Sequence, residues 1–220
     1  MHRIILVIFS LGLPLSSVAS AAITRKPSKP IGDGISVIVV AYYDATYSSL
    51  EKHVRSSEPK SDEDPMKTNI TTLFTKVENH FNKQQINVKF QVKEVAKNNS
   101  FCVQYGKSSL NATGTLQNLR LHAQTAQKPN NTIFFLLTKM TMYEENRRGD
   151  GIPRSLPDVA TFNTFCSGEG SAAVVTNDWK PWQIMSVAAA SASTFGSNSY
   201  SRVHPRDRDN MEKTFKRCHH

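Results

Sequence analysis

The sequence lacks most of the patterns from which catalysis or metal binding is usually inferred. Its three cysteines, Cys102, Cys166 and Cys218, form no C-x-x-C pair and no cysteine–histidine cluster, so a structural zinc site is not expected. No G-x-S-x-G motif is present to support a serine nucleophile. After residue 13, no apolar run approaches the ~18 residues that a membrane-spanning helix needs, so no membrane partner is expected.

The first 21 residues have the pattern of a secretory signal peptide. Arg3 provides a positive charge, residues 4–13 are apolar, and Ala19-Ser20-Ala21 provides small residues for cleavage. Secretion exposes the chain to an oxidising compartment, where three cysteines predict one disulfide and one unpaired thiol. Four N-x-S/T sequences predict glycosylation in exposed turns, at Asn69, Asn98, Asn111 and Asn130.

Acidic residues are in the minority. Lysine and arginine number 27 against 18 aspartate and glutamate residues, a formal net charge of +9. The basic residues gather in segments 25–29, 147–148 and 202–217. They predict a solvated cationic surface, or attraction to acidic partners such as anionic proteins or sulfated glycans. Nucleic acid is not an expected partner, because the chain is predicted to be secreted and has no recognition motif.

The order of predicted elements indicates an α/β fold in a single domain over residues 35–220. A flexible lead-in, residues 22–34, is predicted to precede the domain. The C-terminal part of the domain is predicted to be a basic tail. Strands are predicted at residues 35–43, 86–92, 132–138, 158–162 and 171–176, and helices at residues 66–84, 115–127 and 186–195. Alternating strands and helices favour a mainly parallel sheet with helices on its faces.

The last predicted helix carries a spaced set of small residues. Ala189, Ala190, Ser193, Gly196 and Ser199 stand at the chemical positions of the pattern H-E-x-x-H-x-x-G-x-x-H. Only the glycine is retained. A helix of small residues that ends at a glycine is ordinarily explained by close packing against a sheet, so the spacing gains meaning only from its context.

In this spacing and in element order over residues 35–199, the chain resembles the metzincin metallopeptidases, and within them the reprolysin (adamalysin-like) domain. It is also similar to the 28 kDa metastriate family of tick salivary secreted proteins. The resemblance implies a metzincin-like twisted sheet, mainly parallel, with an antiparallel edge strand and flanking helices. In the family that edge strand pairs with extended peptide, which here points to Val159, Ala160, Thr161 and Phe162. It also implies a disulfide between Cys166 and Cys218, with Cys102 left out.

The departures from the family pattern change the expected function. A catalytic zinc needs three protein ligands and a nearby base. Ala189 has no ligand atom, Ser193 and Ser199 offer neutral hydroxyls, and Ala190 has no carboxylate. We therefore expect no cofactor, and a secreted, inactive pseudo-metallopeptidase of salivary type that binds a host or other extracellular protein or peptide. One alternative is a zinc metalloendopeptidase, which either uses unusual ligands or keeps only the family label through ancestry. The other is a carrier whose emptied cleft holds a small ligand.

Overall fold

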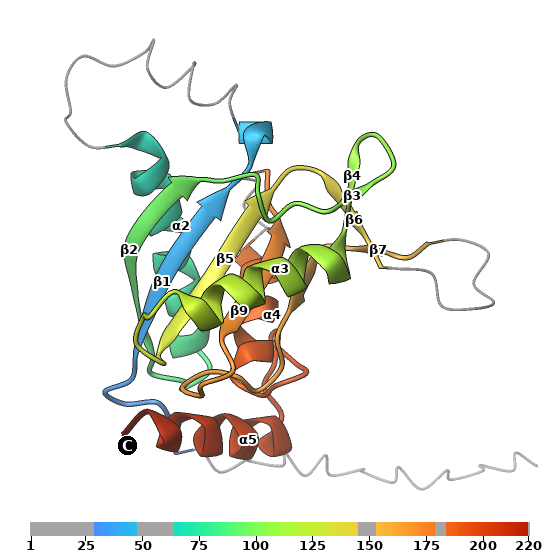
Figure 1. Cartoon of the computed structure of the whole chain (residues 1–220). Coiled ribbons are helices and arrows are strands. Elements are labelled where there is room, and N and C mark those ends of the chain that lie inside the picture. Colours follow the sequence, from blue (N-terminus) through green and yellow to red (C-terminus); the bar gives the residue numbers. More distant parts are fainter. Residues whose placement is uncertain (1–28, 48–63, 145–152, 179–183, 220) are drawn as a thin grey trace, which may run out of the picture.

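The computed structural model describes residues 29–47, 64–144, 153–178 and 184–219 (Figure 1). The predicted signal peptide, residues 1–21, and most of the predicted lead-in lie outside the described residues. So do residues 145–152, which lie between the strands predicted at residues 132–138 and 158–162.

A five-stranded sheet forms the centre of the molecule. Its order is β2 (Lys89–Lys97), β1 (Ser36–Tyr43), β5 (Thr132–Thr138), β9 (Ser171–Thr176) and β8 (Asp158–Ala160). The first four strands are parallel to their neighbours, whereas β8 runs antiparallel to β9. The middle strands are continuous apolar runs because both of their faces are covered. The predicted α/β class, with a mainly parallel sheet and an antiparallel edge strand, is confirmed.

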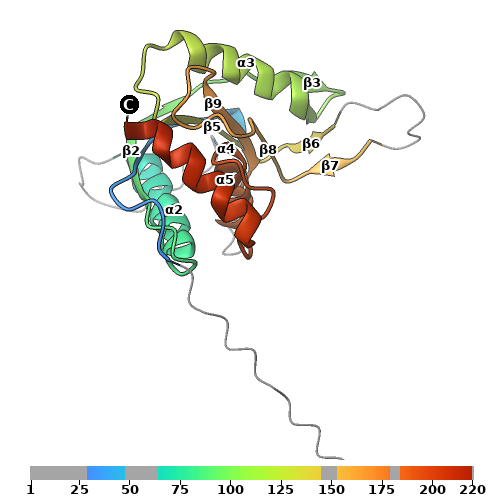
Figure 2. The same cartoon turned by 90° about the horizontal axis from the view of Figure 1, so that it is seen from below.

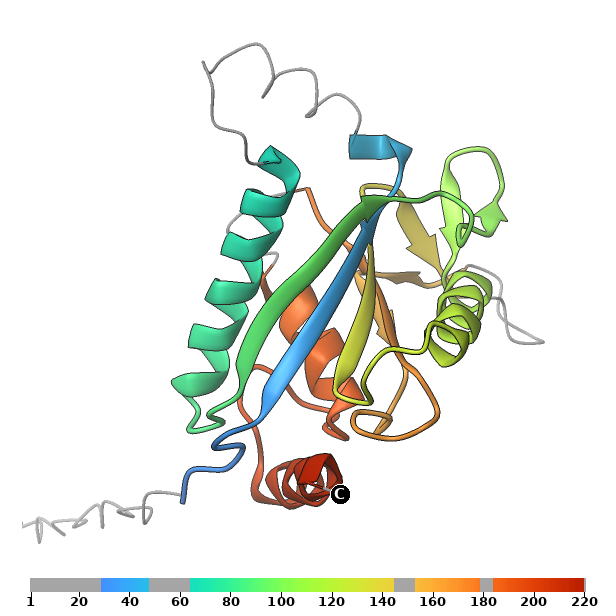
Figure 3. The same cartoon turned by 60° about the vertical axis from the view of Figure 1, so that its left-hand side comes forward.

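Helices cover both faces of the sheet, which gives three layers (Figures 1 and 3). On one face lie α2 (Pro65–Asn82) and α4 (Ile184–Thr194), and on the other lies α3 (Ala112–Thr125). Asp64 caps α2: its Oδ1 accepts a hydrogen bond from the Met66 amide at 3.0 Å, and proline occupies the first turn.

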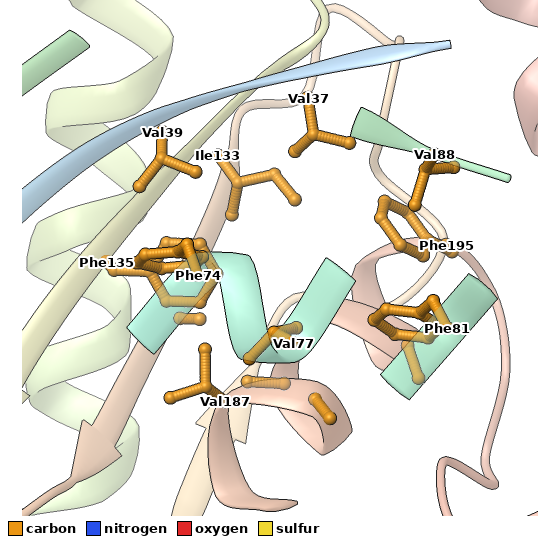
Figure 4. Packing of buried hydrophobic residues seen from close by; sticks show 14 of the residues in the cluster. Val37, Val39, Phe74, Val77, Phe81, Val88, Ile133, Phe135, Val187 and Phe195 are labelled. Carbon is orange, nitrogen blue, oxygen red and sulfur yellow. The ribbon is translucent and has the colours of Figure 1, made fainter. Parts of the chain in front are cut away.

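The larger core lies between the sheet and the helices α2 and α4 (Figure 4). Aromatic rings dominate it: the Phe74 and Phe135 centroids are 4.9 Å apart, and those of Phe81 and Phe195 are 5.7 Å apart. A smaller core under α3 contains Leu119. Because the small residues of α4 let the helix approach closely, these rings can fill the space between α2, α4 and the sheet.

The start of the domain differs from the prediction. Ile31 is 8% exposed and forms a parallel bridge with Ile86, with a 2.7 Å hydrogen bond from the Asn87 amide to the Ile31 carbonyl oxygen. The described part of the predicted flexible lead-in is therefore bound to the domain. Since Ile86 is used in this bridge, β2 begins at Lys89 and not at residue 86.

A second, smaller sheet lies in segments where the sequence analysis placed neither a strand nor a helix. Its strands are β3 (Gln104–Tyr105), β4 (Ser109–Asn111), β6 (Thr141–Tyr143) and β7 (Ser155–Leu156), in that order. The helix α3 also begins three residues before its predicted start, because the Asn111 side chain accepts a hydrogen bond from the Gly114 amide at 2.9 Å.

The predicted basic tail is a packed helix, so the expectation of a tail is wrong for this segment. It forms α5 (Pro205–Lys216), followed by the short 3-10 helix η3 (Arg217–His219). Met211 and Phe215 are buried in the larger core, 0% and 3% exposed. Figure 2, seen from below, shows α5 in front of α4. A proline at the first helical position and apolar residues four apart are the sequence signals of this helix.

Candidate functional site

The turn after α4 requires glycine for reasons of geometry alone. Gly196 has φ of +90°, and a Cβ placed on it would lie 3.0 Å from Asn163 Oδ1 and 3.4 Å from Thr214 Oγ1. The amides of Asn163 and Phe165 donate to the carbonyl oxygens of Ser193 and Thr194 at the end of the helix. The retained glycine of the motif is therefore explained by how α4 meets its neighbours.

The other motif positions differ in exposure and in partners. Ala190 is fully buried in the larger core, whereas Ala189 and Ser193 are half-buried. The Ser193 hydroxyl lies 3.4 Å from the Thr161 carbonyl oxygen, and the Ser199 hydroxyl donates to the Arg202 carbonyl oxygen at 2.8 Å. Both hydroxyls are therefore directed at protein oxygens.

A zinc ion does not fit this donor set. Ala189 has no atom that could bind a metal, and Ala190 offers no carboxylate. The two serines are weak zinc ligands, because zinc in proteins prefers imidazole, thiolate and carboxylate. Within the described ranges, no group of three or more histidine, cysteine, aspartate or glutamate side chains is placed to hold a metal ion.

The edge strand β8 has a free side. The Thr161 amide donates to the Ala172 carbonyl oxygen at 2.9 Å, and the Thr176 amide donates to that of Pro157 at 2.8 Å. In an antiparallel ladder alternate residues face the partner strand, so the main-chain groups of Ala160 and Phe162 point away from β9. Among the described residues, β9 is the only strand that pairs with β8.

The four predicted edge residues therefore have different roles. Val159 packs under α3, and its main chain faces β9. Thr161 is buried, with its Oγ1 2.7 Å from Thr164 Oγ1 and accepting from the Ala172 amide at 3.1 Å. Ala160 packs against the larger core, and Phe162 lies beyond the end of the strand with half of its surface exposed.

A carboxylate that the sequence reasoning missed stands at the start of β8. Asp158 pairs with Val175, which places its side chain on the same face of the sheet as Ala160, the face that α4 covers. Burial raises the pKa of the Asp158 carboxyl from 3.8 to about 6. No sequence pattern indicates this raised pKa, because burial of a single edge residue depends on the neighbouring helix.

Asp158→Asn is expected to change how stability depends on pH. The pKa of Asp158 is higher in the folded state than in the unfolded state. The free energy of unfolding of the wild-type protein, relative to that of the variant, is therefore greatest below pH 3.8, and it falls as the pH rises through about 6. The loss amounts to at most about 3 kcal/mol. Urea unfolding should therefore show the asparagine variant to be the more stable protein at pH 7.5, with little change at pH 4. Asp209→Asn, on an exposed face of α5, is the matched control, and an equal gain there would contradict the assignment.

A second buried carboxylate has a structural role. Asp44 is fully buried at the carboxyl end of β1, the end of the sheet where ligands bind in many α/β proteins. Its Oδ2 accepts from the Thr138 hydroxyl at 2.6 Å and its Oδ1 from the Thr46 amide at 3.0 Å. These bonds join β1, β5 and the short helix η1 (Ala45–Tyr47).

A hollow opens where β8 ends. It has a volume of about 270 Å³ and is lined by Phe162, Asn163, Gly196, Asn210, Lys213, Thr214 and Arg217. Three of these residues belong to α5 and one to η3, in the segment that was predicted to be a tail. The cationic residues of this hollow were therefore missed, although the apolar spacing of α5 could have indicated a packed helix.

The structure contains a Cys166–Cys218 disulfide, the pairing that the resemblance implies, with the two Cα atoms 5.1 Å apart. It attaches η3 to the turn after β8. The third cysteine, Cys102, is an unpaired, half-buried thiol. Burial, and to a smaller extent the charge of Asp44, raises the pKa of Cys102 to about 11, so this thiol stays protonated and weakly nucleophilic at neutral pH.

The glycosylation acceptors lie in different surroundings. Asn130 is exposed in a turn, and the half-buried Asn98 forms a turn by accepting from the Ser100 amide at 2.8 Å. Asn69 is exposed but lies on α2, and Asn111 is half-buried as the cap of α3. The expectation of an exposed turn is therefore wrong for Asn69 and Asn111.

No protein-family model and no curated protein matches the sequence. Three solved structures share parts of the architecture. Archaemetzincin from Methanopyrus kandleri has a TM-score of 0.48 at 14% identity, covering 85% of this chain and 98% of that chain. Metalloproteinase-II from Bacteroides fragilis has a TM-score of 0.47 at 11% identity, covering 86% and 55%. A chaperone–substrate complex has a TM-score of 0.46 at 8% identity, covering 75% and 26%.

All three scores lie below 0.5 at low identity, so no conclusion about function follows from them. Among the helices of the described residues, none is long and apolar enough to cross a membrane.

Proposed function

We propose that this chain is a secreted, catalytically inactive, metallopeptidase-like protein that binds an extended segment of an extracellular protein or peptide along β8. One observation carries the proposal: among the described residues, no strand pairs with the side of β8 that faces away from β9. The helix beside it adds a second point, because its motif positions hold no metal ligand or catalytic base. The glycosylation acceptors and the disulfide are in keeping with secretion.

The free side of β8 supports binding through the main chain. The N–H and C=O groups of Ala160, and those of Phe162, can pair with an added strand 4.7–4.9 Å away, about the usual spacing in a sheet. Such pairing needs no metal. It needs an edge held in place, and here Val159 and Thr161 fix the strand to β9.

The residues of α4 support the absence of catalysis. Peptide hydrolysis by a metallopeptidase needs a metal-bound water and a base to deprotonate it. Ala190, at the position of the base, is buried in the larger core, and Ser193 and Ser199 direct their hydroxyls at carbonyl oxygens. No first shell for a metal can be assembled from these side chains.

Substitution of Ala160 tests the binding mode. In Ala160→Pro the outward N–H is replaced by the proline ring, while Val159 and Thr161 keep their bonds to β9. The matched control, Ala160→Ser, keeps the N–H. Proteins captured from extracellular fluid by the wild type and by Ala160→Ser are expected to be lost, by about tenfold or more, from Ala160→Pro. Circular dichroism and thermal unfolding should show that both variants are folded. Equal capture by the two variants would exclude binding along β8.

Metal analysis tests the absence of catalysis. The protein purified from a secretory host should hold no stoichiometric zinc, and a chelator should leave its melting temperature unchanged, because folding is not coupled to a metal. One zinc per chain together with chelator-sensitive peptidase activity would overturn the proposal in favour of an active metallopeptidase. A small molecule that co-purifies in stoichiometric amount would instead support the carrier alternative.

A further inference from the structure

The 270 Å³ hollow beyond β8 lies where a peptide on the free side of that strand would continue. Phe162 and Asn163 follow directly after β8, Gly196 ends α4, and Lys213 and Arg217 come from α5 and η3. Three segments that are distant in sequence meet here. The hollow is therefore continuous with the proposed peptide-binding edge and chemically different from it.

Hydrogen bonds hold the wall of this hollow in one arrangement. Arg217 Nη2 donates to Asn163 O at 2.9 Å, to Asn163 Oδ1 at 3.1 Å and to Phe165 O at 3.0 Å. The Thr214 hydroxyl donates to Asn163 Oδ1 at 2.7 Å. The Cys166–Cys218 disulfide joins the same two segments. A ligand would therefore meet a preorganised wall, which lowers the entropic cost of binding.

The hollow is positively charged, because Lys213 and Arg217 line it and no carboxylate does. The oxygens that hold Arg217 are all neutral carbonyl and amide oxygens. Lys213 is exposed, and it makes no ion pair with a carboxylate of the described residues. Arg206 lies on the same flank of the helix, since residues 206, 210, 213 and 217 follow helical spacing. An anionic group in the hollow would bring the missing counter-charge.

The acidic residues of α5 do not line this hollow. Asp209 and Glu212 line a separate hollow against residues 29–35, and Lys216 forms an ion pair with Glu212 at 3.4 Å. Asp207 accepts a hydrogen bond from the Asn198 amide at 3.4 Å. The residues that line the hollow beside Phe162 therefore include two cations and no carboxylate.

The two ends of the edge strand also differ. Phe162, 50% exposed, gives an aromatic surface at the cationic end, and Asp158 places a carboxyl group at the other end. A carboxylate of a bound peptide is thus attracted at the Phe162 end and repelled at the Asp158 end once Asp158 is ionised.

We propose that this hollow is a carboxylate subsite of the peptide-binding edge, so that the preferred partner is an extended segment with an acidic group beside Phe162 and none beside Asp158. The inference rests on the proposed binding along β8 and specifies its ligand. The carboxylate can come from an aspartate or glutamate side chain or from the C-terminus of the partner, and these two sources share one chemistry.

Four labelled hexapeptides of alternating threonine and valine, blocked at the N-terminus, provide the probes. One ends in an amidated glutamate, one in an amidated glutamine, and one in a glutamine with a free carboxylate; the fourth begins with glutamate and ends in an amidated glutamine. Fluorescence anisotropy at low salt measures their affinities. Of the two glutamate peptides, one is expected to bind about tenfold more tightly than the peptide that ends in amidated glutamine and has no glutamate, and the other is expected to bind no more tightly than it. The free-carboxylate peptide shows whether a C-terminus suffices.

The matched variants are Lys213→Glu and Lys216→Glu, which change the net charge equally at residues of α5 that line different hollows. Lys213→Glu should abolish the preference for glutamate, and Lys216→Glu should keep it. If binding is lost in Ala160→Pro but glutamate and glutamine peptides bind the wild type equally, this subsite is overturned while the proposed edge binding stands. If no peptide binds in a way that depends on Ala160, both the subsite and the proposed edge binding are overturned. Lys213-dependent binding of labelled heparin oligosaccharide without any peptide preference would overturn the subsite in favour of a glycan surface.

Discussion

Replacing both Cys166 and Cys218 by serine is expected to lower the free energy of unfolding by about 4 kcal/mol. The disulfide spans a sequence separation of 52 residues, and on the chain-entropy model a closed loop of that length restricts the unfolded chain by this amount. The bond also holds η3 against the turn that carries Asn163, so its loss should loosen the cationic hollow. Denaturant unfolding at neutral pH measures the change in stability.

Cys102→Ser is the control for the double substitution. The Cys102 thiol is half-buried and unpaired, so its replacement should cost less than about 1 kcal/mol. A double variant as stable as the wild type would contradict a stabilising role for the disulfide. Peptide mapping without reduction offers an independent check, and a linkage of Cys102 to either of the other cysteines would contradict the pairing itself.

The centre of the fold was predictable because burial on both faces leaves a direct record in the sequence. All seven residues of β5 are buried, and this continuous apolar run was predicted with the same limits, residues 132–138. The start of α2 was equally well marked, since Asp64 supplies the cap and Pro65 the first helical residue. In both cases the local signal and the tertiary environment agree.

The edges of the fold were less predictable because the conformation of their residues depends on contacts with residues that are distant in sequence. The strands of the smaller sheet have two or three residues each, too few for any periodicity to appear. Among the described residues, β2 has only one neighbour in the sheet, so its second half can carry exposed and half-buried polar side chains that resemble a loop. Ile31 is attached to the domain through one bridge to Ile86, which no local sequence pattern predicts.

The candidate site likewise has parts that could be predicted from the sequence and parts that could not. The motif frame on α4 and the position of β8 could be predicted, because both depend on spacing within one segment. The cationic hollow could not, because Lys213 and Arg217 reach Phe162 only through the packing of α5. The elevated pKa of Asp158 likewise depends on how α4 and the sheet exclude water from one carboxyl group.

Restoring the carboxylate of the motif pattern is expected to damage the fold and not to create a catalyst. Ala190 is fully buried in the larger core, which also holds Phe195 and Phe81. Ala190→Glu would place a charged group and added volume among these rings, at a cost of more than about 3 kcal/mol of unfolding free energy. No gain of peptidase activity is expected, because Ala189, Ser193 and Ser199 would still provide no metal site.

The neighbouring position supplies a matched control for this result. Ala189 is half-buried on the exposed side of α4, so Ala189→Glu makes the same chemical change where water can still solvate the carboxylate, and should cost less than about 1 kcal/mol. Urea unfolding of both variants at pH 8 measures the difference. If Ala190→Glu proves as stable as Ala189→Glu, the base position opens to solvent as it would in a working cleft, and the interpretation of α4 as a packed structural helix is wrong.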